Sequence, residues 1–246
     1  MSRIPSFFDS CPTRVVTILH EDPQLLVIHK PAGLLAQPDH TGDRDVLTQG
    51  KAYLAESEAE PFLGLVHRLD RPTSGIMVLA RTSVAARALS RQFRERTAQK
   101  QYLTLVEGTR RGVGTWTDYI AKPGRRPMVV PPDHPDGKRA ALDWQALHRD
   151  GGRTLLLCTL HTGRPHQIRL QAAERDIPVV GDTRYGGPAV DARGAIALHH
   201  AILRIEHPSE PQRKTVVDGL PTHWTPLLND DMREAARRVL ARARPA

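Results

Sequence analysis

The chain has 246 residues, of which 39% are hydrophobic and 25% are charged, an ordinary composition for a water-soluble globular protein. No apolar stretch is long enough to span a membrane, no secretory signal is present, and Cys11 and Cys158 are too few for a disulfide framework. We therefore expect a cytoplasmic protein. Lys and Arg outnumber Asp and Glu by 35 to 27, a net charge of +8. This balance favours a polyanionic partner, although many small proteins are basic without one.

The first part of the chain is predicted to form strands and turns. Residues 1–12 show no periodic pattern and are expected to be a flexible arm, followed by one domain over residues 13–246. In chain order we then expect a hairpin of residues 15–19 and 25–29, a Pro-Gly turn at 30–34, a polar surface loop at 36–45 and a helix at 46–57.

The most informative stretch is a polar turn between two apolar runs, residues 63–66 and 76–80. Each run has the length of a strand, and the second does not alternate, which predicts a strand covered on both faces. The turn carries Asp70 between Arg68 and Arg71, and Pro72 restricts its backbone. Such a loop could hold a reactive carboxylate, or its Asp could simply cap backbone amides.

A helix and a strand should follow. Residues 82–96 have helical spacing with Thr82 or Ser83 as N-cap, and their arginines are expected to face mostly solvent. The apolar face is predicted to contain Val84, Ala85, Ala88, Leu89 and Phe93. Residues 100–108 alternate as a strand that carries Tyr102, one of only four tyrosines. A lone strand tyrosine is more often a core residue than a catalytic one.

The second half of the chain is predicted to contain a basic flap, a hairpin and a short helix. We expect two strand fragments and loops over residues 109–137, and a hairpin of 138–147 and 153–160 that turns at Gly151-Gly152. Gly163 should end this strand and Pro165 should begin a helix with His166, Arg169 and Leu170 on one side. Such a helix could also point Arg169 into water.

The remaining segments complete the predicted sheet. We expect a closing strand at residues 214–217 and a basic helix at about 226–244.

Three of these segments resemble the RluA-type RNA pseudouridine synthase family. The run His-Arg-Leu-Asp-Arg-Pro-Thr-Ser-Gly at 67–75 resembles the family's catalytic motif, and Lys-x-Tyr-x-x-x-Val-x-Gly at 100–108 resembles its second. Thr-Gly-Arg-x-His-Gln-Ile-Arg at 162–169 resembles its third. The turn at residues 30–33 also matches the family, as does segment 177–186, which in the family is a strand and turn after the third motif. Segment 195–208 matches as well, except that His200 stands where the family usually has Ala.

The resemblance implies an α+β fold: a mixed, largely antiparallel sheet with flanking helices and a central RNA-binding cleft. It implies that Asp70 is the catalytic carboxylate, that Arg169 pairs with it, and that Tyr102 lies beside the target base. As further substrate contacts we expect Lys30, His67, Arg68, Arg71, Arg164, His166, Gln167 and Leu170. The implied reaction is isomerisation of a uridine in tRNA or ribosomal RNA, and it requires no cofactor and no metal.

Other classes fit less well. A metal enzyme would use several of the 12 histidines, but the pairs His161/His166 and His199/His200 lack metal-ligand spacing. The third motif offers no second carboxylate for a glycosidase. A non-catalytic RNA-binding protein is the strongest alternative. We expect a monomer without an obligate protein partner or membrane contact. We expect no additional S4 RNA-binding domain, because no basic all-helical stretch lies before Val15. The sequence leaves open which RNA is modified and whether Asp70 attacks the ribose or the base.

Overall fold

The computed structural model describes residues 16–124, 126–190 and 194–245, so the predicted arm at 1–12 lies outside the described residues. Their strands form one sheet in the order β1-β2-β4-β10-β5-β9-β8-β6-β7, with β3 paired to β4 and β11 paired to β10. The strands are β1 Thr17–Glu21, β2 Leu25–Lys30, β3 Gly64–Leu65, β4 Ser74–Ala80, β5 Gln99–Glu107, β6 Val113–Ala121, β7 Met128–Val130, β8 Lys138–Asp150, β9 Arg153–Leu160, β10 Leu198–Glu206 and β11 Arg213–Val217. The helices are α1 Val46–Leu54, α2 Ser83–Glu95, α3 Gln167–Ala173 and α4 Asp230–Ala243, with the 3₁₀ turns η1 Thr183–Tyr185 and η2 Thr222–Leu227.

The sheet is mixed and largely antiparallel, as predicted. Among the described strands only β4 and β10 run parallel, paired at Ser74 with His199 and at Gly75 with His200. The hairpins β1–β2 and β8–β9 form where expected, and the second turns at Gly151-Gly152. The predicted strand at 63–66 is reduced to the two residues of β3, and 177–186 contain only a single bridge from Val179 to Val106 before η1.

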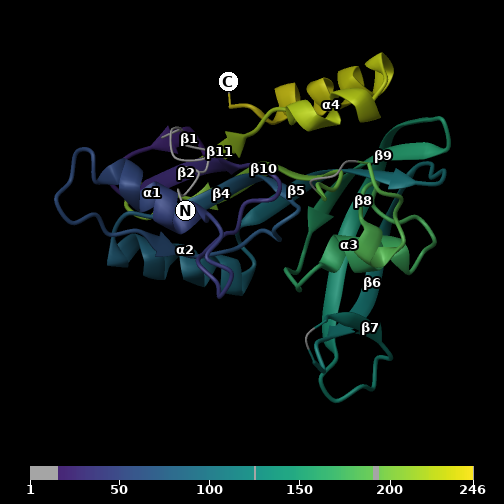
Figure 1. Cartoon of the computed structure of the whole chain (residues 1–246), viewed down its shortest axis with the longest axis horizontal. Coiled ribbons are helices and arrows are strands. Elements are labelled where there is room, and N and C mark those ends of the chain that lie inside the picture. Colours follow the sequence, from purple (N-terminus) through teal and green to yellow (C-terminus); the bar gives the residue numbers. More distant parts are fainter. Residues whose placement is uncertain (1–15, 125, 191–193, 246) are drawn as a thin grey trace, which may run out of the picture.

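Strand β4 is covered on both faces, which confirms the reading of its non-alternating sequence. All seven of its residues are buried. Met77 and Leu79 pack in the same cluster as α1, whereas Ile76 and Val78 pack with α2 on the other face. Figure 1 shows α4 across the sheet on the side away from α2. The loop that carries Asp70 therefore leads directly into the core.

Helix α2 begins as predicted but turns a narrower face inward. The Thr82 hydroxyl oxygen accepts a hydrogen bond from the Ala85 amide at 3.0 Å, which makes Thr82 the N-cap. The buried residues are Ala85, Leu89 and Gln92, while Val84 is 58% exposed, contrary to the prediction. The polar side chain of Gln92 is buried on this face because it makes two hydrogen bonds to the backbone of Glu206. These bonds connect α2 to the end of β10.

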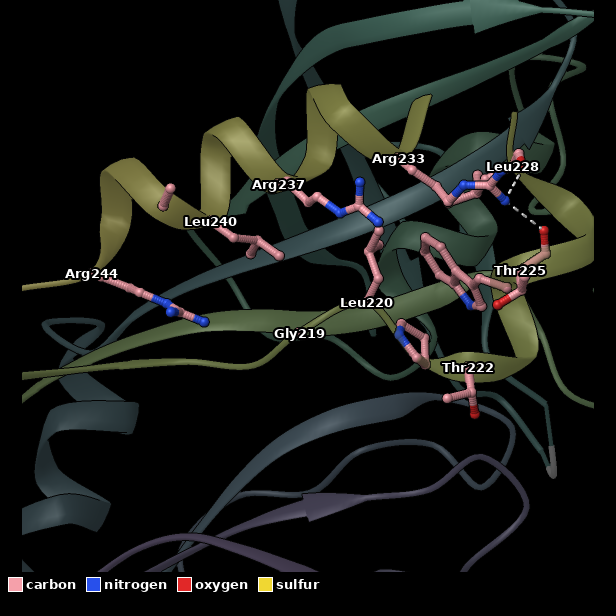
Figure 2. Close-up of a pocket in the computed structure, with 12 residues that line it drawn as sticks. Gly219, Leu220, Thr222, Thr225, Leu228, Arg233, Arg237, Leu240 and Arg244 are labelled. Atoms are coloured by element: carbon pink, nitrogen blue, oxygen red, sulfur yellow. Dashed lines mark hydrogen bonds between the residues drawn. The ribbon is translucent and has the colours of Figure 1, made fainter. Parts of the chain in front are cut away.

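The predicted basic helix at 226–244 starts later than expected. The Asn229 side chain accepts a hydrogen bond from the Met232 amide and caps α4, which begins at Asp230, while Pro226 lies within η2. Figure 2 shows the Arg233 guanidinium reaching the carbonyls of Thr225 and Leu228, at 3.1 and 2.8 Å. These bonds tie α4 to η2 and explain the shift of the helix start.

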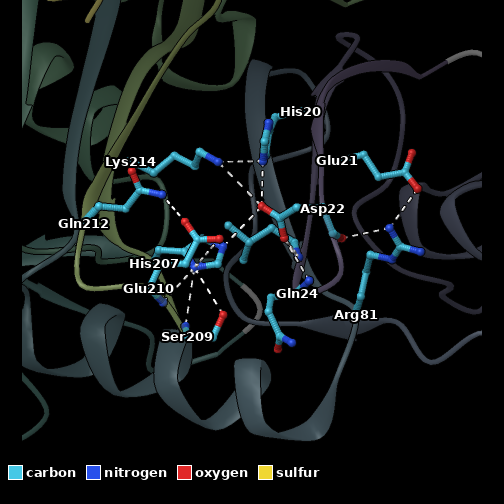
Figure 3. A network of polar contacts seen from close by, with 11 residues as sticks. His20, Glu21, Asp22, Gln24, Arg81, His207, Ser209, Glu210, Gln212 and Lys214 are labelled. Carbon is cyan, nitrogen blue, oxygen red and sulfur yellow. Dashed lines mark hydrogen bonds and ion pairs between the residues drawn. The ribbon is translucent and has the colours of Figure 1, made fainter.

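A polar cluster joins the β1–β2 turn to the β10–β11 turn (Figure 3). The Asp22 carboxylate lies 2.6 Å from His20 Nε2 and 3.2 Å from His207 Nε2, and Lys214 Nζ lies 3.6 Å from it. Asp22 also accepts the amides of its own turn at 2.8 Å. Asp22 and His207 lie 185 positions apart in the sequence. The cluster therefore connects the edge strand β1 to β10 and β11, which lie nearer the middle of the sheet.

The predicted basic flap at 109–137 consists of β6, β7 and their loops. Strand β6 pairs with the long strand β8 on one side and with β7 on the other. Figure 1 shows β6, β7 and the lower part of β8 projecting from the rest of the sheet as an arm, with α3 beside it. Helix α3 packs on this arm through Leu170, which is 7% exposed and lies in a cluster with Ile120 and Ala140. The arm thus carries the helix that presents Arg169.

Candidate active site

Asp70 lies on a braced turn that enters β4. Its carbonyl accepts the Thr73 amide at 3.0 Å. The Gly33 amide donates to the Arg71 carbonyl at 2.7 Å, and Arg71 Nε donates to the Gly33 carbonyl at 3.0 Å. The turn at residues 30–34 therefore crosses the Asp70 turn and holds it by two reciprocal hydrogen bonds.

Lys30 is part of this brace and does not reach the site surface. Its side chain is fully buried, and Nζ donates to the carbonyls of Pro31, Leu34 and Arg71 at 2.7–3.1 Å. Burial lowers the pKa of Lys30 to about 7, although the charge of Asp70 opposes that shift. The expected RNA contact by Lys30 is thus replaced by a structural role, because RNA cannot reach a nitrogen enclosed by carbonyls.

Arg169 meets Asp70 as the motifs predicted. Arg169 Nη1 donates to Asp70 Oδ2 at 3.0 Å, and the Arg169 side chain is 4% exposed against 26% for Asp70. The helix that carries Arg169 begins at Gln167 rather than at Pro165, and its cap His166 has a left-handed backbone with φ 55°. This backbone turns the chain after Pro165, so Arg169 points at Asp70 and not into water.

Asp182 is a third member of this group that the sequence analysis did not single out. Arg169 donates from Nε to Asp182 Oδ2 at 2.6 Å and from Nη2 to Asp182 Oδ1 at 2.9 Å. Burial opposes the charge of Arg169, but the two carboxylates outweigh it and raise its pKa. Asp182 stands in a segment that matched the family, but no spacing in the sequence indicated its partner.

Tyr102 lines the same groove as Asp70 from strand β5. It is 8% exposed, and its ring stacks on His200 with centroids 4.6 Å apart and planes 15° from parallel. Burial raises the pKa of Tyr102, and the charge of Asp70 raises it further, so the hydroxyl stays protonated. A neutral aromatic ring suits contact with a base.

His166 and Tyr185 complete the surroundings of Arg169. His166 Nδ1 lies 2.7 Å from the Tyr185 hydroxyl, and His166 Nε2 lies 3.9 Å from Asp70 Oδ2. The Tyr185 ring lies 5.0 Å from the Arg169 guanidinium. Burial lowers the pKa of His166, which favours the neutral imidazole. Sequence reasoning named His166 but missed Tyr185.

Three other predicted contacts have mainly structural surroundings. Gln167 is 3% exposed, and its side chain bonds Thr162 and the backbone of β8. His67 accepts the Val78 amide at 3.0 Å and stacks on Phe93. Leu170 packs α3 on the arm, as described above. His67 and Gln167 nevertheless line the groove. Arg68 and Arg71, which are exposed, and Arg164 and His166, which are partly exposed, line it too.

The groove has a volume of about 740 Å³ and a basic rim. The cations that line it are Arg68, Arg71, Arg94, Arg96, Lys100, Lys122, Arg164 and Arg169. A smaller cavity of about 370 Å³ meets it at Asp70 and extends towards Asp182 and Arg184. A separate cavity of about 500 Å³ between η2 and α4 (Figure 2) shares no lining residue with either. In the residues that the structure describes, no cluster of metal-ligand side chains occurs.

A groove that combines a carboxylate, a buried arginine and an aromatic ring beneath a basic rim has the chemistry that an enzyme acting on a nucleic acid requires. A family model for RNA pseudouridylate synthase matches residues 24–174, and the chain belongs to this family. It is an RNA pseudouridine synthase, an isomerase that acts on RNA.

Relatives and solved structures agree with this assignment. An RNA pseudouridine synthase of Synechocystis is 36% identical over 86% of this chain and 67% of its own length. Ribosomal large subunit pseudouridine synthase D of Xanthomonas campestris is 36% identical over 91% of this chain and 73% of its own. The structure of human RNA pseudouridylate synthase domain containing 4 is 25% identical, covers 89% of this chain and 92% of its own, and superimposes with a TM-score of 0.69. The predicted fold is therefore confirmed.

Proposed function

We propose that Asp70 is the carboxylate that drives the isomerisation, with Arg169 as its charged partner and Tyr102 as the surface that receives the base. The observation that carries this proposal is the 3.0 Å contact between Arg169 Nη1 and Asp70 Oδ2, inside the groove that Tyr102 lines. The 26% exposure of the Asp70 side chain leaves it accessible to a substrate.

The chemistry fits these groups. Conversion of uridine to pseudouridine breaks the bond from C1′ to N1, forms one from C1′ to C5, and moves one proton from C5 to N1. No electron or external group is exchanged, so an ionised carboxylate acting as nucleophile or base is sufficient. A buried guanidinium orients such a carboxylate through a charge-assisted hydrogen bond.

The uridine must leave its stack to reach Asp70, at a cost of roughly a few kcal/mol. Arg68 is exposed on the rim of the groove, two residues before Asp70. We assign to it the space that the flipped base vacates, or the adjacent phosphate. The other rim cations would neutralise the RNA backbone, and binding should weaken steeply with salt.

The substrate proposed is ribosomal RNA of the large subunit, because several relatives similar over most of this chain are named for that reaction. Transfer RNA is the second candidate. The protein is proposed to act in the cytoplasm as a monomer, with one catalytic domain over residues 13–246 and no cofactor or obligate protein partner. Among the described helices, none is both long and apolar enough to cross a membrane.

The test compares the parent protein with Asp70→Asn on large-subunit ribosomal RNA and tRNA transcripts labelled with tritium at uridine C5, without added cofactor. We expect tritium release and pseudouridine only with the parent. The matched control is Asp39→Asn, which removes another carboxylate that lines the groove but is not bound to Arg169. An active Asp70→Asn variant would refute the assignment, and RNA binding without tritium release from either protein would favour the non-catalytic alternative.

A further inference from the structure

Arg169 is shared unequally by two carboxylates. Asp182 takes the edge formed by Nε and Nη2 with both of its oxygens, at 2.6 and 2.9 Å. Asp70 takes only Nη1, with one oxygen at 3.0 Å. In the described part of the chain, no hydrogen bond reaches the other Asp70 oxygen, Oδ1. The stronger, two-pronged pair is thus not the one made with the proposed catalytic carboxylate.

Burial follows the same order. The side chains of Asp182 and Arg169 are 1% and 4% exposed, whereas that of Asp70 is 26% exposed. Two carboxylates and one guanidinium leave a net charge of −1, and the buried pair of Asp182 with Arg169 is neutral by itself. The uncompensated negative charge therefore belongs to the accessible carboxylate.

Asp182 is held in place by its own loop. Its amide donates to the Val179 carbonyl at 3.0 Å, and its carbonyl accepts the amides of Tyr185 and Gly187 at 3.0 and 2.8 Å. Tyr185 from the same loop covers the Arg169 guanidinium at 5.0 Å. One short loop therefore fixes both the edge and the face of the arginine.

We propose that Asp182 is a positioning residue that occupies the forked edge of Arg169, so that Asp70 receives a single hydrogen bond and keeps one oxygen free to act on the substrate. Without Asp182, Arg169 would turn its fork and its full charge towards Asp70, and the carboxylate would be both better shielded and less reactive. This inference rests on the proposed role of Asp70.

The test is Asp182→Asn, assayed by tritium release with activity expressed per folded molecule. We expect kcat to fall by on the order of 10- to 100-fold, the range found for residues that orient catalytic metal ligands. KM should change little, because Asp182 is buried. The acidic limb of the pH–rate profile should move to lower pH, because the positive charge facing Asp70 is no longer offset.

The matched control is Asp118→Asn. Asp118 pairs with Arg175 at 3.0 Å, and Arg175 lies 5.1 Å from the Trp116 ring, so this pair repeats the arrangement of Asp182, Arg169 and Tyr185 without touching Asp70. Its loss should lower stability and leave the pH profile unchanged. A parental profile and kcat per folded molecule for Asp182→Asn would overturn the inference.

A second variant covers the case in which Asp182→Asn does not fold. Asp182→Glu keeps the charge but lengthens the side chain by one methylene, so kcat should fall while the acidic limb stays in place. Parental kcat in Asp182→Glu would then overturn the inference. Asp70→Asn separates the two proposals: if it is inactive while both Asp182 variants behave as the parent, only the positioning role fails, and if it is active, the proposed function fails.

Discussion

The ring of Tyr102 stacks on the imidazole of His200, with centroids 4.6 Å apart and planes 15° from parallel. His200 is fully buried on β10, lies 2.7 Å through Nδ1 from the Ile76 carbonyl, and has a pKa lowered to about 3 by burial. The neutral imidazole of His200, fixed on the strand next to β5, therefore supports one face of the Tyr102 ring.

His200→Ala should loosen Tyr102 and leave a cavity behind it. We expect a loss of about 2–4 kcal/mol in the free energy of unfolding and a several-fold rise in KM, because the ring no longer presents a fixed surface to the base. Urea unfolding and steady-state kinetics measure the two effects. His200→Phe keeps a stacked ring and should retain a near-parental KM; equal KM values in Ala, Phe and parent would contradict the stacking role.

Gly75 should not tolerate a side chain. It has φ +118°, and a Cβ there would lie 2.5 Å from the His200 backbone nitrogen, inside the parallel pairing of β4 with β10. Gly75→Ala should cost about 3 kcal/mol or more, measured by denaturant unfolding. Gly219→Ala is the control, since an added Cβ there meets nothing within 4 Å. A fully stable Gly75→Ala variant would mean that the two strands are spaced differently.

Lys30→Met should uncouple the Asp70 turn from its brace. The change leaves the carbonyls of Leu34 and Arg71 without the buried donor, so we expect a loss of about 2–4 kcal/mol and lower kcat. Amide hydrogen exchange should quicken at Thr73, whose amide closes the turn. Lys122→Met removes an exposed lysine that lines the groove and should leave stability unchanged. If the two variants are equally stable, the ammonium does not brace the turn.

The Asp22 cluster predicts acid sensitivity. Burial alone would raise the pKa of Asp22, but hydrogen bonds from two histidines and two backbone amides together hold it well below its usual 3.8. The folded state therefore binds this proton more weakly than the unfolded chain, so the stabilisation is present above about pH 4 and is lost below it. Asp22→Asn should lower the free energy of unfolding at pH 7 by about 1–3 kcal/mol. That free energy should also decrease less between pH 7 and pH 3 than in the parent, as measured by urea unfolding at each pH. A parallel fall in both proteins would contradict this account.

Sequence patterns predicted the parts of the site that local chemistry determines. The stiff turn at Asp70 and the buried strand after it follow from turn chemistry and period. The position of Tyr102 beside the groove and the proximity of Asp70 to Arg169 were implied by the resemblance to the family's motifs. Roles for these residues are tested only by the variants above.

What the sequence could not predict depends on long-range packing. From the sequence, Lys30 resembles a surface cation. Its burial among carbonyls depends on the crossing of the turn at residues 30–34 with the Asp70 turn. From the sequence, Asp182 resembles an ordinary acidic loop residue, because no neighbouring residue indicates that it pairs with Arg169, 13 positions earlier in the chain. The late start of α4 depends on the contacts of Arg233 with η2, which periodicity does not contain.

The place of β10 in the sheet has a consequence for synthesis of the protein. β10 lies between β4 and β5, yet it is followed by only one further described strand. While the chain emerges from the ribosome, the strands up to β4 and those from β5 to β9 can pair within their own halves but not with each other across this gap. The two halves should join only when most of the chain has been translated. Such a delayed, non-local step makes folding slow and leaves open strand edges that chaperones would need to shield.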